Sequence, residues 1–156
     1  MALTGQQHVS VPQFANTVAS AYHECMSLHF DSLSGAGVLV NNAPKLPILQ
    51  AQLLAQCNAN LASSGAEVHL LQQIQPFILS YWTGLIFTGP LGVTTVLSPG
   101  SFTGLPVVQN TNFNIILTAF INCCRVHLLT LTGQYVSSVV PGVVSPWSGA
   151  LLIPMP

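Results

Sequence analysis

Apolar residues in the first half of the chain recur at helical spacing, and the first such stretch follows Ser10. Its spacing of i, i+4 and i+7 places the side chains on one face of a helix. The apolar members of this face are Phe14, Val18, Tyr22, Cys25 and Met26. Ser10 and Gln13 have the spacing of a capping box, with a proline between them in the first turn. We therefore predict a helix from about Val11 to Leu28.

Two further helical stretches follow in the first half. The stretch Pro47–Ala62 carries a regular apolar stripe, and its opposite face is polar but uncharged. The stripe consists of Leu49, Leu53, Cys57 and Leu61. Ser64 and Glu67 form a second capping box, which starts a helix that runs to about Leu85 and that Pro76 kinks or interrupts. The short turn between these stretches predicts an antiparallel helical hairpin.

Glycine and proline recur in the second half of the chain from Gly84 onward, and runs of β-branched residues lie between them. The runs Val93–Leu97 and Pro106–Gln109 predict short strands or extended segments, and Gly37–Val40 in the loop between the first two helices predicts a short strand. Phe113–Leu131 fits a helix by its apolar spacing, although its β-branched and aromatic content favours strands. We expect a helix there.

The tail from Val136 to Pro156 carries four prolines and no charged residue. Proline lacks a backbone donor and is excluded from helix interiors and central strands. We therefore predict an extended arm, residues 136–156, attached to a single domain at residues 1–135. This domain is α+β, with a helical N-terminal half and a C-terminal half rich in strands and loops. The side chains that we expect at interfaces with neighbouring chains are Trp147, Leu151, Leu152, Ile153 and Met155 in the arm, with Tyr81 and Trp82 in the domain.

Charge is nearly absent from the chain. Charged residues make up 3% of it, against about 25% in ordinary soluble domains. They are Glu24, Asp31, Lys45, Glu67 and Arg125. Charge of either sign keeps proteins dispersed, so a neutral surface associates with lipid, with partner chains or with copies of itself. Two basic residues also give no electrostatic footprint for a phosphate backbone, and we expect no direct binding of nucleic acid.

Residues that carry chemistry are too few and too scattered to indicate an enzyme. His23 begins the metalloprotease pattern HExxH, but Ser27 stands where the second histidine is needed. Cys123 and His127 have the spacing of two metal ligands on a helix, and no CxxC element accompanies them. Cys25 has histidines nearby in sequence but no evident orienting acid. We therefore expect no catalytic residue, no cofactor, no metal and no small-molecule substrate.

The cysteines indicate a reducing environment. The four cysteines form no CxxC pair, and the N-terminal segment lacks the basic start and apolar run of a signal peptide. We expect buried, reduced thiols of a cytosolic protein. A bridge between Cys25 and Cys57 on two helices is the alternative.

Two functional classes fit this sequence. We favour a structural subunit of a large assembly, such as a minor capsid, connector or tail protein of a virus or phage particle that is assembled in the host cytoplasm. Its partners would be copies of itself or other subunits of the particle. The alternative is an integral membrane subunit with one or two spans at about Pro76–Leu97 and Phe113–Leu131. Proline and glycine interrupt the first span, and its flanks lack the Lys/Arg asymmetry that orients membrane proteins.

Overall fold

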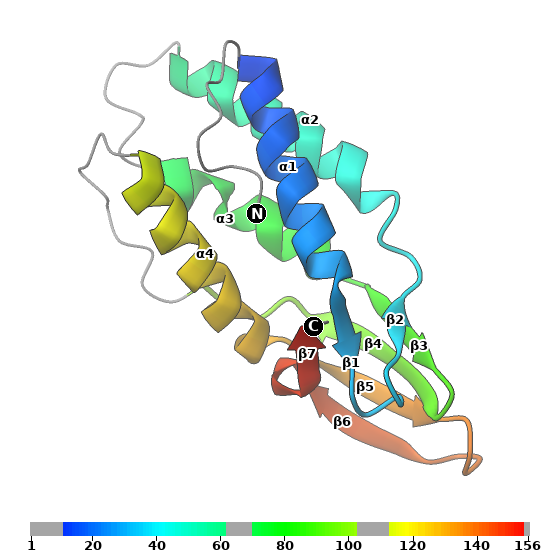
Figure 1. Cartoon of the computed structure of the whole chain (residues 1–156). Coiled ribbons are helices and arrows are strands. Elements are labelled where there is room, and N and C mark those ends of the chain that lie inside the picture. Colours follow the sequence, from blue (N-terminus) through cyan, green and yellow to red (C-terminus); the bar gives the residue numbers. More distant parts are fainter. Residues whose placement is uncertain (1–10, 62–69, 103–112, 155–156) are drawn as a thin grey trace.

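The computed structural model describes residues 11–61, 70–102 and 113–154, in which four helices and seven strands form an α+β fold. The helices are α1 (Val11–Ser27), α2 (Lys45–Leu61), α3 (Leu70–Trp82) and α4 (Phe113–Thr130). The strands are β1 (His29–Asp31), β2 (Val38–Leu39), β3 (Ile86–Gly89), β4 (Gly92–Ser98), β5 (Thr132–Ser137), β6 (Val144–Ser148) and β7 (Leu152–Pro154), with the 3-10 helix η2 (Gly149–Leu151) before β7. The helices occupy one end of the molecule and the strands the other (Figure 1).

Helices α1, α2 and α3 pack through apolar faces, and in α1 the buried face is shifted from the predicted one: Tyr22 and Met26 are buried as predicted, whereas Phe14, Val18 and Cys25 are half-buried. Ala15 and Ala19 of α1 are buried in the same cluster as Leu49 and Leu53 of α2, and such small side chains let a neighbouring helix approach closely. Pro47 lies in the first turn of α2, where a missing N–H costs no helical hydrogen bond. The predicted helices at Val11–Leu28 and Pro47–Ala62 are confirmed to within two residues at each end.

The third helix is shorter than the sequence predicts. It contains Pro76 and ends at Trp82, where Gly84 follows with a φ of +75° that redirects the chain into β3. The expected span at Pro76–Leu97 is therefore not one helix, because α3, β3 and β4 divide it. The helix expected at Phe113–Leu131 is confirmed as α4.

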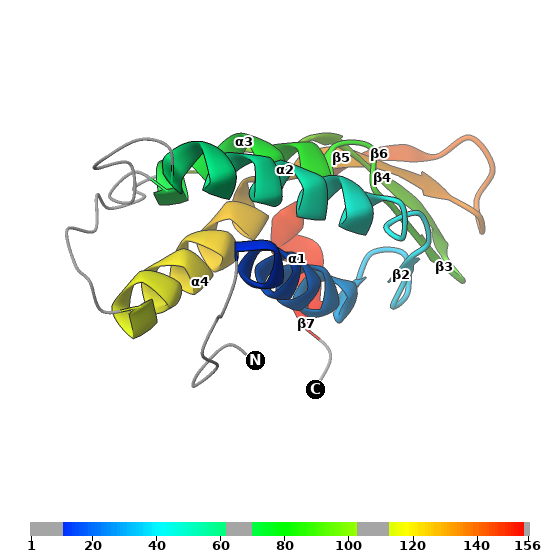
Figure 2. The same cartoon turned by 90° about the horizontal axis from the view of Figure 1, so that it is seen from above.

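Five antiparallel strands form the larger sheet, in the order β2-β3-β4-β5-β6. The strands predicted at Gly37–Val40 and Val93–Leu97 are confirmed as β2 and β4. A second, two-stranded sheet pairs β1 with β7, and it lies on one side of the larger sheet (Figures 1 and 2). An isolated bridge between Asp31 and Gly37 links β1 to the start of β2.

Asp31, at the end of β1, is fully buried and joins three strands through its carboxylate. Oδ1 accepts hydrogen bonds from the Leu33 backbone N–H at 3.2 Å and the Trp147 indole N–H at 2.9 Å. Oδ2 accepts from the Ser34 backbone N–H at 3.0 Å and the Thr94 hydroxyl at 2.7 Å. A buried carboxylate is tolerated when hydrogen bonds replace its hydration, and here four donors do so.

The tail is extended, as predicted, but it packs on its own domain. β6 pairs with β5 and β7 pairs with β1, and Trp147 is 2% exposed beside Phe87, with ring centroids 6.1 Å apart. The expectation of an arm that reaches a neighbouring chain is therefore wrong for residues 136–154. Pro146 is compatible with β6 because β6 is an edge strand and the proline nitrogen lies on the side that faces away from β5.

Three predicted features lie outside the described residues. They are the N-cap of the first helix at Ser10, the capping box at Ser64 and Glu67, and the strand at Pro106–Gln109.

Candidate interaction surface

The few charged residues add little charge to the surface. Those within the described part of the chain are Glu24, Asp31, Lys45 and Arg125. Asp31 is buried, whereas the Lys45 ammonium donates to the carbonyl oxygens of Ser80 at 3.2 Å and Thr83 at 2.8 Å. These carbonyls belong to the C-terminal end of α3, where a cation stabilises the helix dipole. Glu24 and Arg125 remain as exposed charges.

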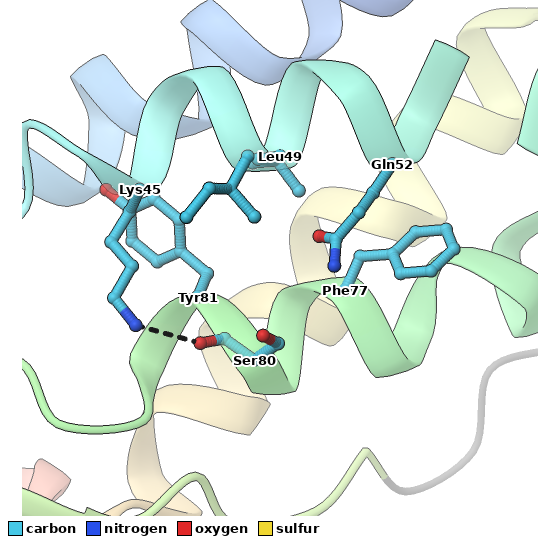
Figure 3. Close-up of a pocket in the computed structure, with 7 residues that line it drawn as sticks. Lys45, Leu49, Gln52, Phe77, Ser80 and Tyr81 are labelled. Atoms are coloured by element: carbon cyan, nitrogen blue, oxygen red, sulfur yellow. Dashed lines mark hydrogen bonds between the residues drawn. The ribbon is translucent and has the colours of Figure 1, made fainter. Parts of the chain in front are cut away.

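A small hollow beside Lys45 does not have the size of a ligand site. It lies between α2 and α3 and has a volume of about 30 Å³. Its lining comprises Lys45, Ile48, Leu49, Gln52, Phe77, Ser80 and Tyr81 (Figure 3). Small-molecule sites are roughly 300–1,000 Å³, so this hollow has room for water and not for an organic ligand.

His23 of α1 and His29 of β1 form hydrogen bonds that serve packing. His23 Nδ1 lies 2.8 Å from the Tyr81 hydroxyl, and His29 Nδ1 lies 3.0 Å from the Cys25 carbonyl oxygen. Burial lowers the pKa of His23 and raises the pKa of Tyr81, which disfavours the charged form of each. These contacts direct both imidazoles to groups other than the Cys25 sulfur.

His127 of α4 is fully buried and anchors the segment that follows β4. Its Nε2 donates to the Pro99 carbonyl oxygen at 2.6 Å, and its ring stacks on Phe102 with centroids 4.2 Å apart. Burial raises the pKa of the Cys123 and Cys124 thiols, so both stay protonated. Among the described residues, no three His, Cys, Asp or Glu side chains are grouped as metal ligands.

The residues expected at interfaces divide into three groups. Tyr81, Trp82 and Trp147 are buried in the chain's own core, so the expectation that they contact neighbouring chains is wrong for them. The Trp82 indole donates to the Tyr22 hydroxyl at 2.7 Å, so the polar N–H of this buried aromatic has its hydrogen-bond partner within the same chain. The remaining residues lie at the surface or beyond the described part: Leu151 and Leu152 are half-buried, Ile153 is exposed, and Met155 lies outside the described residues.

The outer face of the five-stranded sheet, on the side away from Trp147, is open and uncharged. Pairing in register aligns one side chain from each strand in a row: Val38 with Thr88, Thr88 with Val93, Val93 with Val136, and Val136 with Val144. All five are β-branched, and Val136 and Val144 are 45% and 50% exposed. A second row on the same face consists of Ile86, Thr95, Gln134 and Pro146. We call these two rows the outer sheet face.

The loop between β5 and β6 continues this apolar surface. Val140 O accepts from Val143 N at 3.3 Å across Pro141 and Gly142, and Gly142 has a φ of +80°. These features identify a type II turn, which needs glycine at its third position. The Ser137 hydroxyl accepts from the backbone N–H groups of Val139 and Val140 at 3.2 and 3.0 Å. The loop is thus held in one shape while it exposes Val139, Val140 and Val143.

Part of this surface could be anticipated from the sequence. The Pro141-Gly142 dipeptide between two valine-rich runs is a turn signal, and alternation within Val144–Ser148 is a strand signal. The row itself could not be anticipated, because it depends on the register of five strands that are distant in sequence.

Within the described ranges, no helix has both the length and the apolar character needed to cross a membrane. Searches of protein-family models, of curated proteins and of solved structures find no match to the chain.

Proposed function

We propose that the protein is a non-enzymatic structural subunit of a large assembly, which packs against its neighbours through the outer sheet face. The observation that carries the proposal is the row of five uncharged β-branched side chains from Val38 to Val144, of which four are exposed and Val93 is half-buried. Monomeric proteins rarely leave such a contiguous apolar patch uncovered. The lack of charge over the rest of the chain removes the usual barrier to association.

A viral or phage particle is the kind of assembly that we propose. A shell or tail buries much of each subunit's surface among its neighbours, and neutral Ser, Thr, Asn and Gln can pair across such contacts without the desolvation cost of ions. This part of the proposal rests on composition, since the tail packs on its own domain and provides no arm.

A single charge on the outer sheet face tests the proposal. Val136→Lys places an ammonium on β5, next to the centre of the row, whereas Ala55→Lys places one on the exposed side of α2 as a matched control. We expect light scattering after size exclusion at high protein concentration to give a mass above that of one chain for the parent and the control, and a smaller mass for Val136→Lys. A Val136→Lys chain that assembles as well as the parent does would remove the support for this surface.

A further inference from the structure

We propose that the occupant of the outer sheet face is a second copy of this chain, packed face to face so that two five-stranded sheets form a sandwich. This inference rests on the proposed function and names its partner. Two sheets pack about 10 Å apart when both inner faces carry apolar, β-branched side chains. The outer sheet face supplies such a row without any partner of its own within the described part of the chain.

The absence of charge is the first argument for a second copy. Neither row of the outer sheet face contains a charged residue. Most protein surfaces carry many ions, and burying an unpaired ion against this face would be costly. Another copy of this chain, with 3% charged residues, presents a face that is equally neutral. With a net charge of −1, two copies also repel each other very little.

The edges of the sheet indicate that copies associate through the outer sheet face and not by pairing of edge strands. Ser137 N donates to Val143 O, and Gly149 N donates to Leu131 O, so the odd-numbered residues of β6 turn their backbone groups toward β5. Pro146 is therefore an outward-facing position, and it has no N–H to offer to another strand. At the other edge, β2 has two residues. Both edges are protected in ways that natural sheets use against edge pairing.

The area of the outer sheet face predicts a weak dimer. The strands β2 to β6 have 2, 4, 7, 6 and 5 residues, and at about 3.4 Å per residue and about 4.8 Å between strands they span on the order of 400 Å² per chain. Two such faces together reach about 800 Å², which is below the roughly 1,000 Å² of a stable specific interface. We therefore expect dimers that dissociate on dilution, and stable association where the contact is repeated in a larger particle.

A lipid surface is a poorer match to this face. Thr88, Thr95 and Gln134 place hydroxyl and amide groups among the valines, and such groups lose hydrogen bonds to water in hydrocarbon. The two rows also contain no tryptophan, tyrosine or lysine of the kind that anchors proteins at a bilayer surface.

Exchange of charge between two copies tests the inference. Val136 is one strand away from the central strand β4, so its copies in the two chains lie near the two-fold axis of a sandwich. Chains with Val136→Lys and with Val136→Glu are measured alone and as an equal mixture by sedimentation velocity. The pairs Val144→Lys with Val144→Glu and Ala55→Lys with Ala55→Glu provide a second site and an exposed control. Circular dichroism checks that each variant is folded.

We expect the parent to associate in a concentration-dependent way and each single-charge variant to associate at least about tenfold more weakly, because like charges then meet across the contact. The mixture should regain association and lose it again at high salt. Charged variants that associate as the parent does, or a mixture that regains nothing, would overturn the sandwich. A parent that stays monomeric would overturn the inference that a second copy covers the outer sheet face, while the proposed structural role would then need a different partner. Flotation of the parent with phosphatidylcholine vesicles would identify that partner as lipid.

Discussion

Replacing Asp31 by asparagine tests whether its carboxylate holds β1, β4 and β6 together. The substitution keeps the size of the side chain and turns one acceptor oxygen into an NH₂ donor. Whichever oxygen is replaced, two of the four donors lose their acceptor inside a fully buried site. A hydrogen bond to a charged group contributes roughly 1.5–3 kcal/mol, and an unsatisfied buried donor costs roughly 1–3 kcal/mol.

These terms are offset in part because the buried charge is also removed, and we expect a net loss of about 3 kcal/mol in the free energy of unfolding. Total stabilities are about 5–15 kcal/mol, so the loss is large. Thr94→Val is the matched control, since it removes one donor and leaves three, and it should cost about 1 kcal/mol.

Urea denaturation followed by circular dichroism measures both variants, in a Val136→Lys background that keeps association from shifting the equilibrium. A loss below about 0.5 kcal/mol for Asp31→Asn, which is the range of ordinary surface substitutions, would refute the reasoning.

The remaining predictions concern other single contacts. Lys45→Met keeps the aliphatic stem but removes two hydrogen bonds at the end of α3, and thermal unfolding should report a loss of about 0.5–1 kcal/mol. Gly142→Ala forces a left-handed φ on an alanine with no neighbour within 4 Å, so urea denaturation should report a loss of about 1 kcal/mol from strain alone. Burial lowers the pKa of His127 below 6.5, so on acidification the unfolded chain takes up this proton at a higher pH than the folded chain does. The His127 contribution to stability is complete above about pH 6.5 and is lost as the pH falls through the folded pKa. His127→Gln, which keeps a donor for Pro99, should therefore flatten the fall in melting temperature on acidification. Deletion of residues 145–156 removes β7, Trp147 and all of β6 except Val144, and it should abolish the cooperative unfolding transition. A truncated chain that still unfolds cooperatively would mean that the tail is an arm and not part of the domain.

The helices could be predicted from the sequence because their signal is local. Apolar spacing within one segment decides which face is buried, as for Tyr22 and Met26 in α1. Tertiary context adjusted the ends, and α3 ends at Trp82 where Gly84 redirects the chain. Phe113–Leu131 had mixed propensities, and its helical spacing was the better indicator.

The arrangement of the tail could not be predicted because its signal is not local. Trp147 donates to Asp31, which is 116 residues away, and no pattern in either segment names the other. The exclusion of proline from strand pairing holds for a central strand and not for an outward position of an edge strand, such as Pro146 in β6. The outer sheet face depends on the same long-range register, so no local pattern indicates it.

Hydroxyl-radical footprinting of the assembled and the diluted protein tests the central claim most directly, because it reports which side chains a neighbour covers. The account predicts that Val136 and Val144 react in the diluted chain and are protected in the assembly, while Leu129, which is 60% exposed on α4, serves as a reference on another element. Equal reactivity of Val136 and Val144 in the two states would contradict the claim that the outer sheet face is the surface through which this protein assembles.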